Sequence, residues 1–151
     1  MITIRFRRIP SPRGRLPQLP HHATEGAAGA DLTANIDAPL TIAPMARAVV
    51  PTGLAMELPD MGYGAFVFAR SGLGIKHGLT LSNGVGVIDS DYRGEVSVGL
   101  VNLSEQAYTI QPGERIAQLC ILPVIQFAAE EAEELAQTGR GTGGFGSTGR
   151  Q

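Results

Sequence analysis

The chain has 151 residues and a formal net charge of −2, which gives no bulk electrostatic reason to expect binding to nucleic acid or to a membrane surface. Its single cysteine, Cys120, excludes an intrachain disulfide and leaves no cysteine pair for a structural zinc site. No run of about 20 apolar residues is present to span a bilayer, and residues 1–8 lack the apolar region of a secretory signal. These features predict a single-domain cytoplasmic protein.

Short strands separated by turns are the dominant pattern. Twenty glycines and ten prolines interrupt the chain every few residues, which is typical of an all-β protein. Apolar and charged residues alternate over 2–9, predicting a first strand, and an irregular segment rich in Pro and Arg follows over 10–20. Pro51-Thr52-Gly53 is expected to separate two strands. The remaining strands are predicted over 30–34, 40–42, 48–50, 54–58, 65–68, 79–81, 85–88, 95–101, 108–110 and 115–124.

Only two segments have helical character. Residues 71–76 can form one turn near a loop, and residues 128–136 consist of strong helix formers. The four glutamates of the second segment favour a solvated linker over a metal site. Beyond it, six glycines occur within 139–149, so this end of the chain is expected to be a flexible arm. An aromatic residue is unusual in such an arm, which leaves Phe145 either incidental or able to stack on a base.

The most informative stretch is Gly-Val-Ile-Asp-Ser-Asp-Tyr-Arg-Gly-Glu-Val at 86–96. It places Asp89, Asp91, Tyr92 and Arg93 at a turn between two strand-forming runs, which predicts a hairpin. A solvated turn needs no apolar lead-in to an acidic pair. A site that activates water beside a sugar and a phosphate would use all four side chains.

Other polar residues admit both structural and functional interpretations. Arg70-Ser71-Gly72 forms a loop at a strand end that can hold phosphate, although it lacks the Lys-Ser/Thr of a P-loop. Gln118 interrupts an apolar run and is either a satisfied core amide or a site residue. Cys120 is expected to be a small buried hydrophobe, and His21-His22 is expected to be a surface pair without a third metal ligand.

Five segments, taken in order, resemble the five ordered motifs of the trimeric dUTPases, the deoxyuridine 5′-triphosphate nucleotidohydrolases. The resemblance runs from about residue 19 to the C-terminus, and the third and fifth segments are the most specific. The segments are Ala-Gly-Ala-Asp-Leu at 28–32, Ala-Arg-Ser-Gly-Leu-Gly at 69–74, Asn83 with 86–94, Arg-Ile-Ala-Gln-Leu at 115–119 and Arg-Gly-Thr-Gly-Gly-Phe-Gly-Ser at 140–147.

The resemblance implies a jelly-roll-like distorted β-barrel over residues 1–136 and a flexible arm over 137–151. It implies a homotrimer whose active sites lie at subunit interfaces, where the arm closes over a site built largely by neighbouring chains. The reaction would be the Mg²⁺-assisted hydrolysis of dUTP to dUMP and pyrophosphate. This activity limits uracil incorporation into DNA and supplies dUMP for dTMP synthesis.

The same resemblance assigns roles within the third motif. Asp89 would orient and deprotonate the water that attacks the α-phosphorus, and Tyr92 would lie against the deoxyribose and reject ribonucleotides. Asp91 would be a turn residue or a local structural partner, and Arg93 a structural or interface cation. The uracil edge would be bound by Asn83 and by the backbone of Gly86, Val87 and Ile88.

Phosphate recognition is implied for the remaining motifs. Mg²⁺ would be held mainly by the substrate phosphates and water, with no direct protein ligand, and Asp31 would reach it at most through a water. The arm residues would bind the γ-phosphate end and stack over uracil. The phosphate-binding residues would be Arg70, Ser71, Gly72 and Gln118, and the arm residues Arg140, Phe145, Gly146 and Ser147.

One departure and two alternatives stand beside this resemblance. Ala69 occupies a position where many family members have proline, which affects loop shape and no chemistry. A related dCTP deaminase would share the barrel but would be expected to carry a catalytic glutamate motif that is not found in the barrel here. A non-catalytic nucleotide-binding regulator on the same fold need not keep Asp89.

Overall fold

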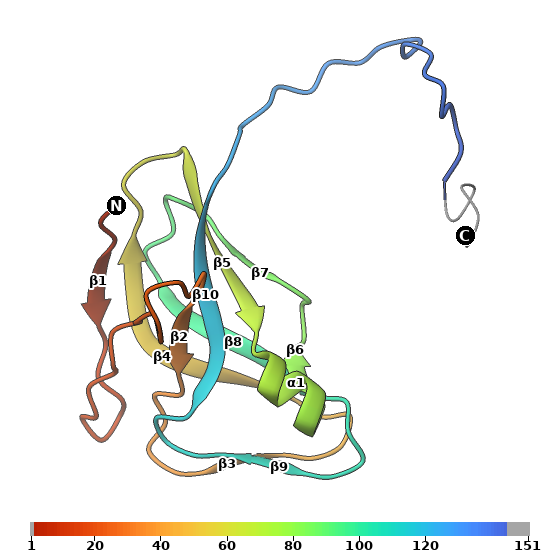
Figure 1. Cartoon of the computed structure of the whole chain (residues 1–151). Helices are drawn as coiled ribbons and strands as arrows, with labels where there is room; N and C mark the ends of the chain where they lie inside the picture. The colour runs from red at the N-terminus through yellow and green to blue at the C-terminus, as the bar shows by residue number, and fades with distance from the viewer. Residues whose placement is uncertain (1, 145–151) are drawn as a thin grey trace.

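The computed structural model describes residues 2–144, which form ten β-strands and one helix. Figure 1 shows the strands wrapped into one body with α1 at one side. The elements are β1 (Arg5–Arg8), β2 (Ala30–Thr33), β3 (Leu40–Ile42), β4 (Arg47–Glu57), β5 (Tyr63–Ala69), α1 (Ser71–His77), β6 (Leu79–Leu81), β7 (Gly86–Ile88), β8 (Glu95–Asn102), β9 (Tyr108–Ile110) and β10 (Arg115–Pro123).

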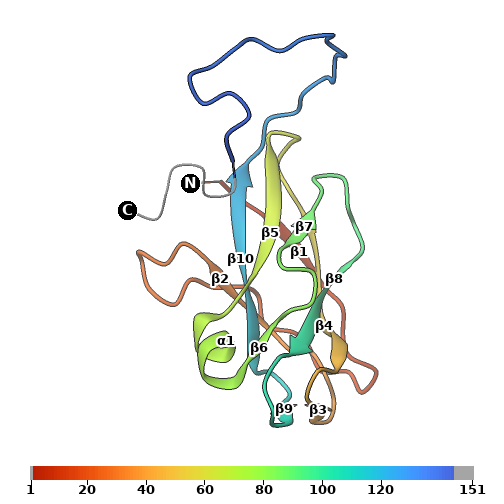
Figure 2. The same cartoon turned by 90° about the vertical axis from the view of Figure 1, so that its right-hand side faces the viewer.

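Two four-stranded antiparallel sheets enclose the core. One has the strand order β1-β4-β8-β6 and the other β2-β10-β5-β7, while β3 and β9 form a separate ribbon. In Figure 2, β2, β10 and β5 of one sheet lie to the left of β4 and β8 of the other. Both sheets contribute to one apolar cluster, so the predicted all-β, jelly-roll-like class is confirmed. The most buried members of the cluster include Leu32, Val50, Leu54, Ala65, Val98, Leu100, Ile116 and Ala117.

The predicted strands are confirmed in position, with one exception. Residues 51–53 do not separate two strands, because β4 runs unbroken from Arg47 to Glu57. A bulge accommodates the proline and glycine instead: the pairing of β4 with β8 shifts register between Pro51 and Leu54, and Gly53 adopts a φ of 70°. A glycine at a positive φ bends a strand without ending it.

The bulge around Gly53 joins four segments of the chain. The Gly53 carbonyl oxygen accepts a hydrogen bond from the Ile9 amide at 2.7 Å, and the Pro51 carbonyl accepts one from the Asn35 amide at 2.8 Å. The Asn35 side chain donates to the Ile9 carbonyl at 3.1 Å. From the other side, the Glu95 carboxylate accepts the Gly53 amide proton at 2.7 Å. The bulge therefore fixes the ends of β1 and β2 and the start of β8 to β4.

Helical structure is limited to α1 within residues 2–144. The predicted turn at 71–76 is confirmed as a helix over 71–77, which ends at Gly78 with a φ of 65°. The helical interpretation of 128–136 is wrong, because residues 124–144 contain neither helix nor strand. Residues 128–136 are exposed and too few to form a stable helix without packing against the rest of the protein. No helix in the described part of the chain has the length and apolar character to cross a membrane.

Cys120 is less enclosed than expected. It lies on β10 opposite Phe66 and is half-buried, with no disulfide partner. Burial raises the pKa of its thiol above the usual range, which disfavours the reactive thiolate.

Replacing Gly53 with alanine is expected to lower the free energy of unfolding by about 2 kcal/mol or more, because an L side chain is strained at a positive φ. The added Cβ would also lie 2.8 Å from the Ile9 carbonyl oxygen. Thermal denaturation at fixed protein concentration measures the effect. Gly26→Ala is the matched control, since nothing lies within 4 Å of its added Cβ. Equal melting temperatures for the two variants would contradict the expectation.

Candidate active site

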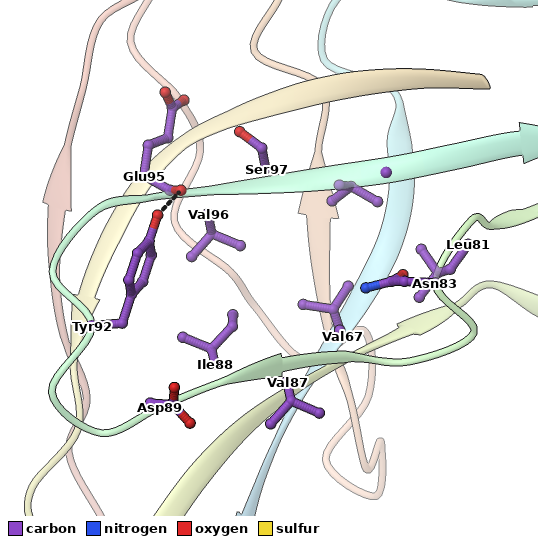
Figure 3. Close-up of a pocket in the computed structure, with 13 residues that line it drawn as sticks. Val67, Leu81, Asn83, Val87, Ile88, Asp89, Tyr92, Glu95, Val96 and Ser97 are labelled. Atoms are coloured by element: carbon purple, nitrogen blue, oxygen red, sulfur yellow. Dashed lines mark hydrogen bonds between the residues drawn. The ribbon is translucent and has the colours of Figure 1, made fainter.

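A cavity of about 240 Å³ opens between β7 and β8 (Figure 3). We call it the β7–β8 cavity. One sheet contributes β8 and the end of β6, and the other contributes β7 and Val67 of β5. Its walls therefore come from both sheets. The lining residues are Val67, Leu81, Asn83, Gly86, Val87, Ile88, Asp89, Tyr92, Glu95, Val96, Ser97, Val98 and Gly99.

The hairpin expected around the acidic turn is not formed. β7 pairs with β5, whereas β8 pairs with β4 and β6. Residues 89–94 therefore cross from one sheet to the other, and the cavity lies under this crossing. The sequence interpretation was wrong because two strands joined by a short turn normally pair, and nothing in their side-chain pattern reveals that each has a different partner.

β7 is an edge strand, since it ends its sheet next to β5. An edge strand presents unpaired backbone N–H and C=O groups on its outer side. Gly86 lets this backbone approach β5 closely, because an added Cβ there would lie 3.0 Å from the Cβ of Val67. The cavity is thus bordered by a backbone edge that offers both donors and acceptors.

Asn83 and Tyr92 mark the two ends of the cavity in Figure 3. Asn83 lies in the turn before β7, and its side-chain amide points between the two strands. At the other end, the Tyr92 hydroxyl donates to the Glu95 carbonyl oxygen at 3.1 Å, and the Tyr92 amide donates to the Asp89 carbonyl at 3.2 Å. The Tyr92 side chain is held at the rim while 46% of the residue's surface stays exposed.

Asp89 lies immediately after β7 at the Tyr92 end of the cavity. It is exposed, and none of the ion pairs formed within residues 2–144 involves its carboxylate. An exposed carboxylate next to a cavity is available to accept a proton from a bound water.

Asp91 and Arg93 differ from Asp89 in their surroundings. Neither lines the β7–β8 cavity. The Arg93 guanidinium donates to the carbonyl oxygens of Ser90 at 2.7 Å and Tyr92 at 3.0 Å. These bonds brace the crossing segment, in keeping with the structural role that the resemblance implies for Arg93.

A second cavity, of about 300 Å³, lies beside the start of α1. We call it the α1 cavity. It brings Arg70 and the first two residues of α1, Ser71 and Gly72, together with β2 and β10. Its lining residues are Ala23, Ala27, Ala28, Gly29, Asp31, Arg70, Ser71, Gly72, Arg115 and Gln118. It shares no lining residue with the β7–β8 cavity.

Asp31 organises the α1 cavity. Its side chain is only 10% exposed, and its carboxylate oxygens lie 3.0 Å from Nε of Arg70 and 3.1 Å from a terminal nitrogen of Arg115. Arg70 also donates to the Arg115 carbonyl at 3.2 Å. Gln118 is half-buried and donates to the Ala69 carbonyl at 2.9 Å. Two guanidiniums are thus held in fixed positions around one carboxylate.

Sequence reasoning did not include Arg115 and Glu95 among the site residues, although both lie in segments that it singled out. Arg115 opens the fourth motif, and Glu95 follows the acidic turn. Their positions in the two cavities become evident only when β10 is seen beside β2 and the start of β8 beside β4. No signal in the sequence distinguishes them from other charged strand residues.

The arm is described only in part. Arg140 is exposed, and its side chain donates to the Gly143 carbonyl at 2.8 Å. Phe145, Gly146 and Ser147 lie outside the described residues. In residues 2–144, no three or more His, Cys, Asp or Glu side chains are grouped to hold a metal ion.

Together these features define an all-β protein with one cavity edged by free backbone groups and another edged by fixed guanidiniums. That combination suits a ligand with a planar polar ring and an oxyanionic end.

The comparisons identify the family. The dUTPase family model matches residues 17–149, and the chain belongs to this family. The deoxyuridine 5′-triphosphate nucleotidohydrolase of Thiobacillus denitrificans is 57% identical over 134 residues, covering 89% of this chain and 92% of its own. The protein of that name from Desulfitobacterium hafniense is 56% identical over 137 residues, covering 91% of each chain. A solved Staphylococcus bacteriophage 80alpha dUTPase with dUPNHPP has a TM-score of 0.86 at 26% identity, covering 99% of each chain.

Asp31→Ala is expected to lower the free energy of unfolding by about 1–3 kcal/mol, because two guanidiniums lose a mostly buried partner. Denaturant unfolding measures the change. Glu57→Ala is the matched control: its pair with Arg5 is 3.7 Å long and both side chains are exposed, so its loss should cost less than about 1 kcal/mol. Equal losses in the two variants would show that Asp31 does not organise the arginines.

Proposed function

We propose that the chain hydrolyses dUTP to dUMP and pyrophosphate. The observation that carries this proposal is the position of Asp89, a free carboxylate at the mouth of a cavity that has an edge-strand backbone along one side and the Tyr92 ring at its rim. Family membership supports the same activity.

Uracil binds along β7. Its N–H and two carbonyl groups pair with the backbone of Gly86, Val87 and Ile88 and with the Asn83 amide, which line the β7–β8 cavity. Cytosine presents an amino donor where uracil has an acceptor, and the thymine methyl group meets the strand itself. Both mismatches leave polar groups unpaired or displaced in a confined site, which is a strong source of discrimination.

Deoxyribose lies against Tyr92. Two hydrogen bonds hold Tyr92 in place: its hydroxyl donates to the Glu95 carbonyl, and its backbone amide donates to the Asp89 carbonyl. A ring held in this way cannot move aside for a 2′-hydroxyl, so ribonucleotides are excluded by shape.

The phosphates bind in the α1 cavity through Arg70, Ser71, Gly72 and Gln118. Guanidiniums pair with phosphate oxygens in a bidentate manner, and fixed ones lose little entropy on binding. The two cavities of one chain have no lining residue in common. In this proposal one chain supplies the base and sugar site and another supplies the phosphate site, as in the homotrimer with active sites between subunits that the resemblance implies.

The reaction is an attack by water on the α-phosphorus. Asp89 orients the water and accepts its proton while the new P–O bond forms and the bond from the α-phosphorus to the α,β-bridging oxygen breaks. Pyrophosphate leaves and dUMP remains. General-base assistance of this kind contributes about 10²–10⁴-fold to the rate, and positioning with charge neutralisation supplies much of the rest.

Mg²⁺ fits this site as an ion held chiefly by phosphate oxygens and water. Mg²⁺ retains several waters and needs few protein carboxylates. Asp31 is the carboxylate of the α1 cavity, and its oxygens keep further lone pairs that can accept from a metal-bound water. When bound, the ion neutralises phosphate charge.

The arm completes the site in this proposal. Residues 137–151 close over an active site of the trimer, with Arg140 and Ser147 at the γ-phosphate end, Phe145 over uracil and Gly146 beside it. The boundary between barrel and arm at residue 136 and the cytoplasmic location stay predictions.

Asp89→Asn is expected to retain binding of dUTP but to reduce kcat at least about 100-fold, because an amide cannot accept the proton of the attacking water. Pyrophosphate release with dUTP, dCTP, dTTP and UTP measures turnover and selectivity, and calorimetry with a non-hydrolysable dUTP analogue measures binding. Asp91→Asn is the matched control, since Asp91 does not line the β7–β8 cavity. Near-normal turnover by Asp89→Asn would remove Asp89 from the role of base, and ammonia release from dCTP would favour the deaminase alternative.

Deleting residues 139–151 is expected to remove most of the activity while the remaining chain still folds and assembles. The reason is that, among residues 2–144, the core residues all precede residue 124. Sedimentation measures the oligomeric state, and the pyrophosphate assay measures activity. Loss of the assembly on truncation would show that the arm is structural.

A further inference from the structure

Glu95 is the first residue of β8 and lines the β7–β8 cavity, yet its carboxylate is already bonded to the backbone. Its Oε1 accepts the Gly53 amide proton at 2.7 Å. It belongs to none of the ion pairs formed by residues 2–144. A half-buried carboxylate with an amide donor and no cationic partner makes a directional, charge-assisted bond. Glu95 therefore fixes the position of its own backbone relative to the β4 bulge.

That backbone holds Tyr92. The Glu95 carbonyl oxygen accepts the Tyr92 hydroxyl proton at 3.1 Å, so the side chain and the main chain of Glu95 face two different partners. Gly94 allows the ring to fold back over the turn, because an added Cβ at that position would overlap the Tyr92 hydroxyl. The ring is consequently located by a chain of contacts that runs from Gly53 through Glu95 to Tyr92.

At the Gly53 end of this series of contacts, the backbone is held by further hydrogen bonds. Gly53 is held by the Ile9 amide on its carbonyl side, and the neighbouring Thr52 hydroxyl donates to the Val96 carbonyl at 2.5 Å. Thr52 is fully buried. The bulge on β4 thus holds Glu95, and through the Glu95 carbonyl group it determines where the Tyr92 ring lies at the rim of the cavity.

We propose that Glu95 is a positioning residue for sugar selectivity: it fastens the start of β8 to the β4 bulge and so holds the carbonyl group that anchors the Tyr92 ring against the 2′ side of the sugar. This inference rests on the proposed hydrolysis of dUTP and adds to it a residue that touches neither the phosphates nor the base. Removing the carboxylate frees the ring to tilt, which admits a 2′-hydroxyl.

The test compares kcat/KM for dUTP with kcat/KM for UTP in matched variants. Glu95→Ala is expected to reduce the ratio about tenfold, the effect of one lost hydrogen bond to a charged group. Glu95→Asp should behave like Glu95→Ala, because its shorter side chain does not reach the Gly53 amide. Glu95→Gln should restore most of the ratio, since its amide oxygen still accepts that proton.

A double-mutant cycle identifies the path of the effect. Tyr92→Phe removes the hydroxyl and leaves the Gly53 contact intact, and it should reduce the ratio by a similar factor. If Glu95 acts through the Tyr92 anchor, the double variant Glu95→Ala with Tyr92→Phe should be no worse than either single variant. Multiplied effects in the double variant would overturn the proposal.

The folding of every variant is checked in parallel, so that a changed ratio is not mistaken for loss of folded protein. Glu57→Ala removes another carboxylate from the same sheet, one whose ion pair within residues 2–144 is with exposed Arg5, and should leave the ratio unchanged. If Glu95→Ala does not fold, Glu95→Gln and Tyr92→Phe still decide the matter: an altered ratio in Glu95→Gln with an unaltered one in Tyr92→Phe would contradict the proposal. If the wild-type protein fails to hydrolyse dUTP, the proposed function fails. If it hydrolyses dUTP and Glu95→Ala keeps the wild-type ratio, only this inference fails.

Discussion

Gly53 adopts a positive φ where β4 shifts register against β8, and the contacts made at that point hold several segments of the barrel. Its amide and carbonyl groups bond outward to Glu95 and Ile9, which are far apart in sequence. In a regular strand without the bulge, the Gly53 amide and carbonyl groups would bond only to the neighbouring strands of the sheet. The strand instead ties together the starts or ends of β1, β2 and β8. A backbone irregularity thus serves as the fixed point from which the cavity is built.

The crossing of residues 89–94 between sheets follows from the same arrangement. β8 is committed to β4 and β6, so β7 must pair elsewhere and takes the free edge of β5. This leaves the other edge of β7 unpaired, and the space between the sheets becomes a cavity. A simple hairpin would have used those backbone groups for strand pairing. The unpaired edge is what makes backbone recognition of a base feasible.

Strand positions could be predicted from the sequence because alternation and turn residues are local signals. The strand partners could not, since pairing depends on which edges remain free in the whole barrel. The same limit explains why the hairpin expected around residues 89–94 is not formed, and two further expectations were wrong for related reasons. Residues 51–53 have the composition of a turn, but β4 pairs with β8 both before and after them, so they form a bulge within the strand. Residues 128–136 have the composition of a helix, but no packed surface stabilises one. The five motifs indicated candidate site residues, whereas the network from Gly53 to Tyr92 depends on contacts across three strand ends.

The charges that line the two cavities give a physical reason why, in the proposed trimer, two chains would share one active site. The β7–β8 cavity has the free carboxylate of Asp89 at its mouth, and no cationic side chain of residues 2–144 lines it. The α1 cavity holds two guanidiniums and one carboxylate. A triphosphate placed against Asp89 in a single chain would meet like charge without compensation, which opposes binding. In the proposed trimer, the guanidiniums of a second chain stand beside Asp89, so that the phosphates and the general base can lie close together. Assembly then supplies the electrostatic balance of the reaction as well as the shape of the site.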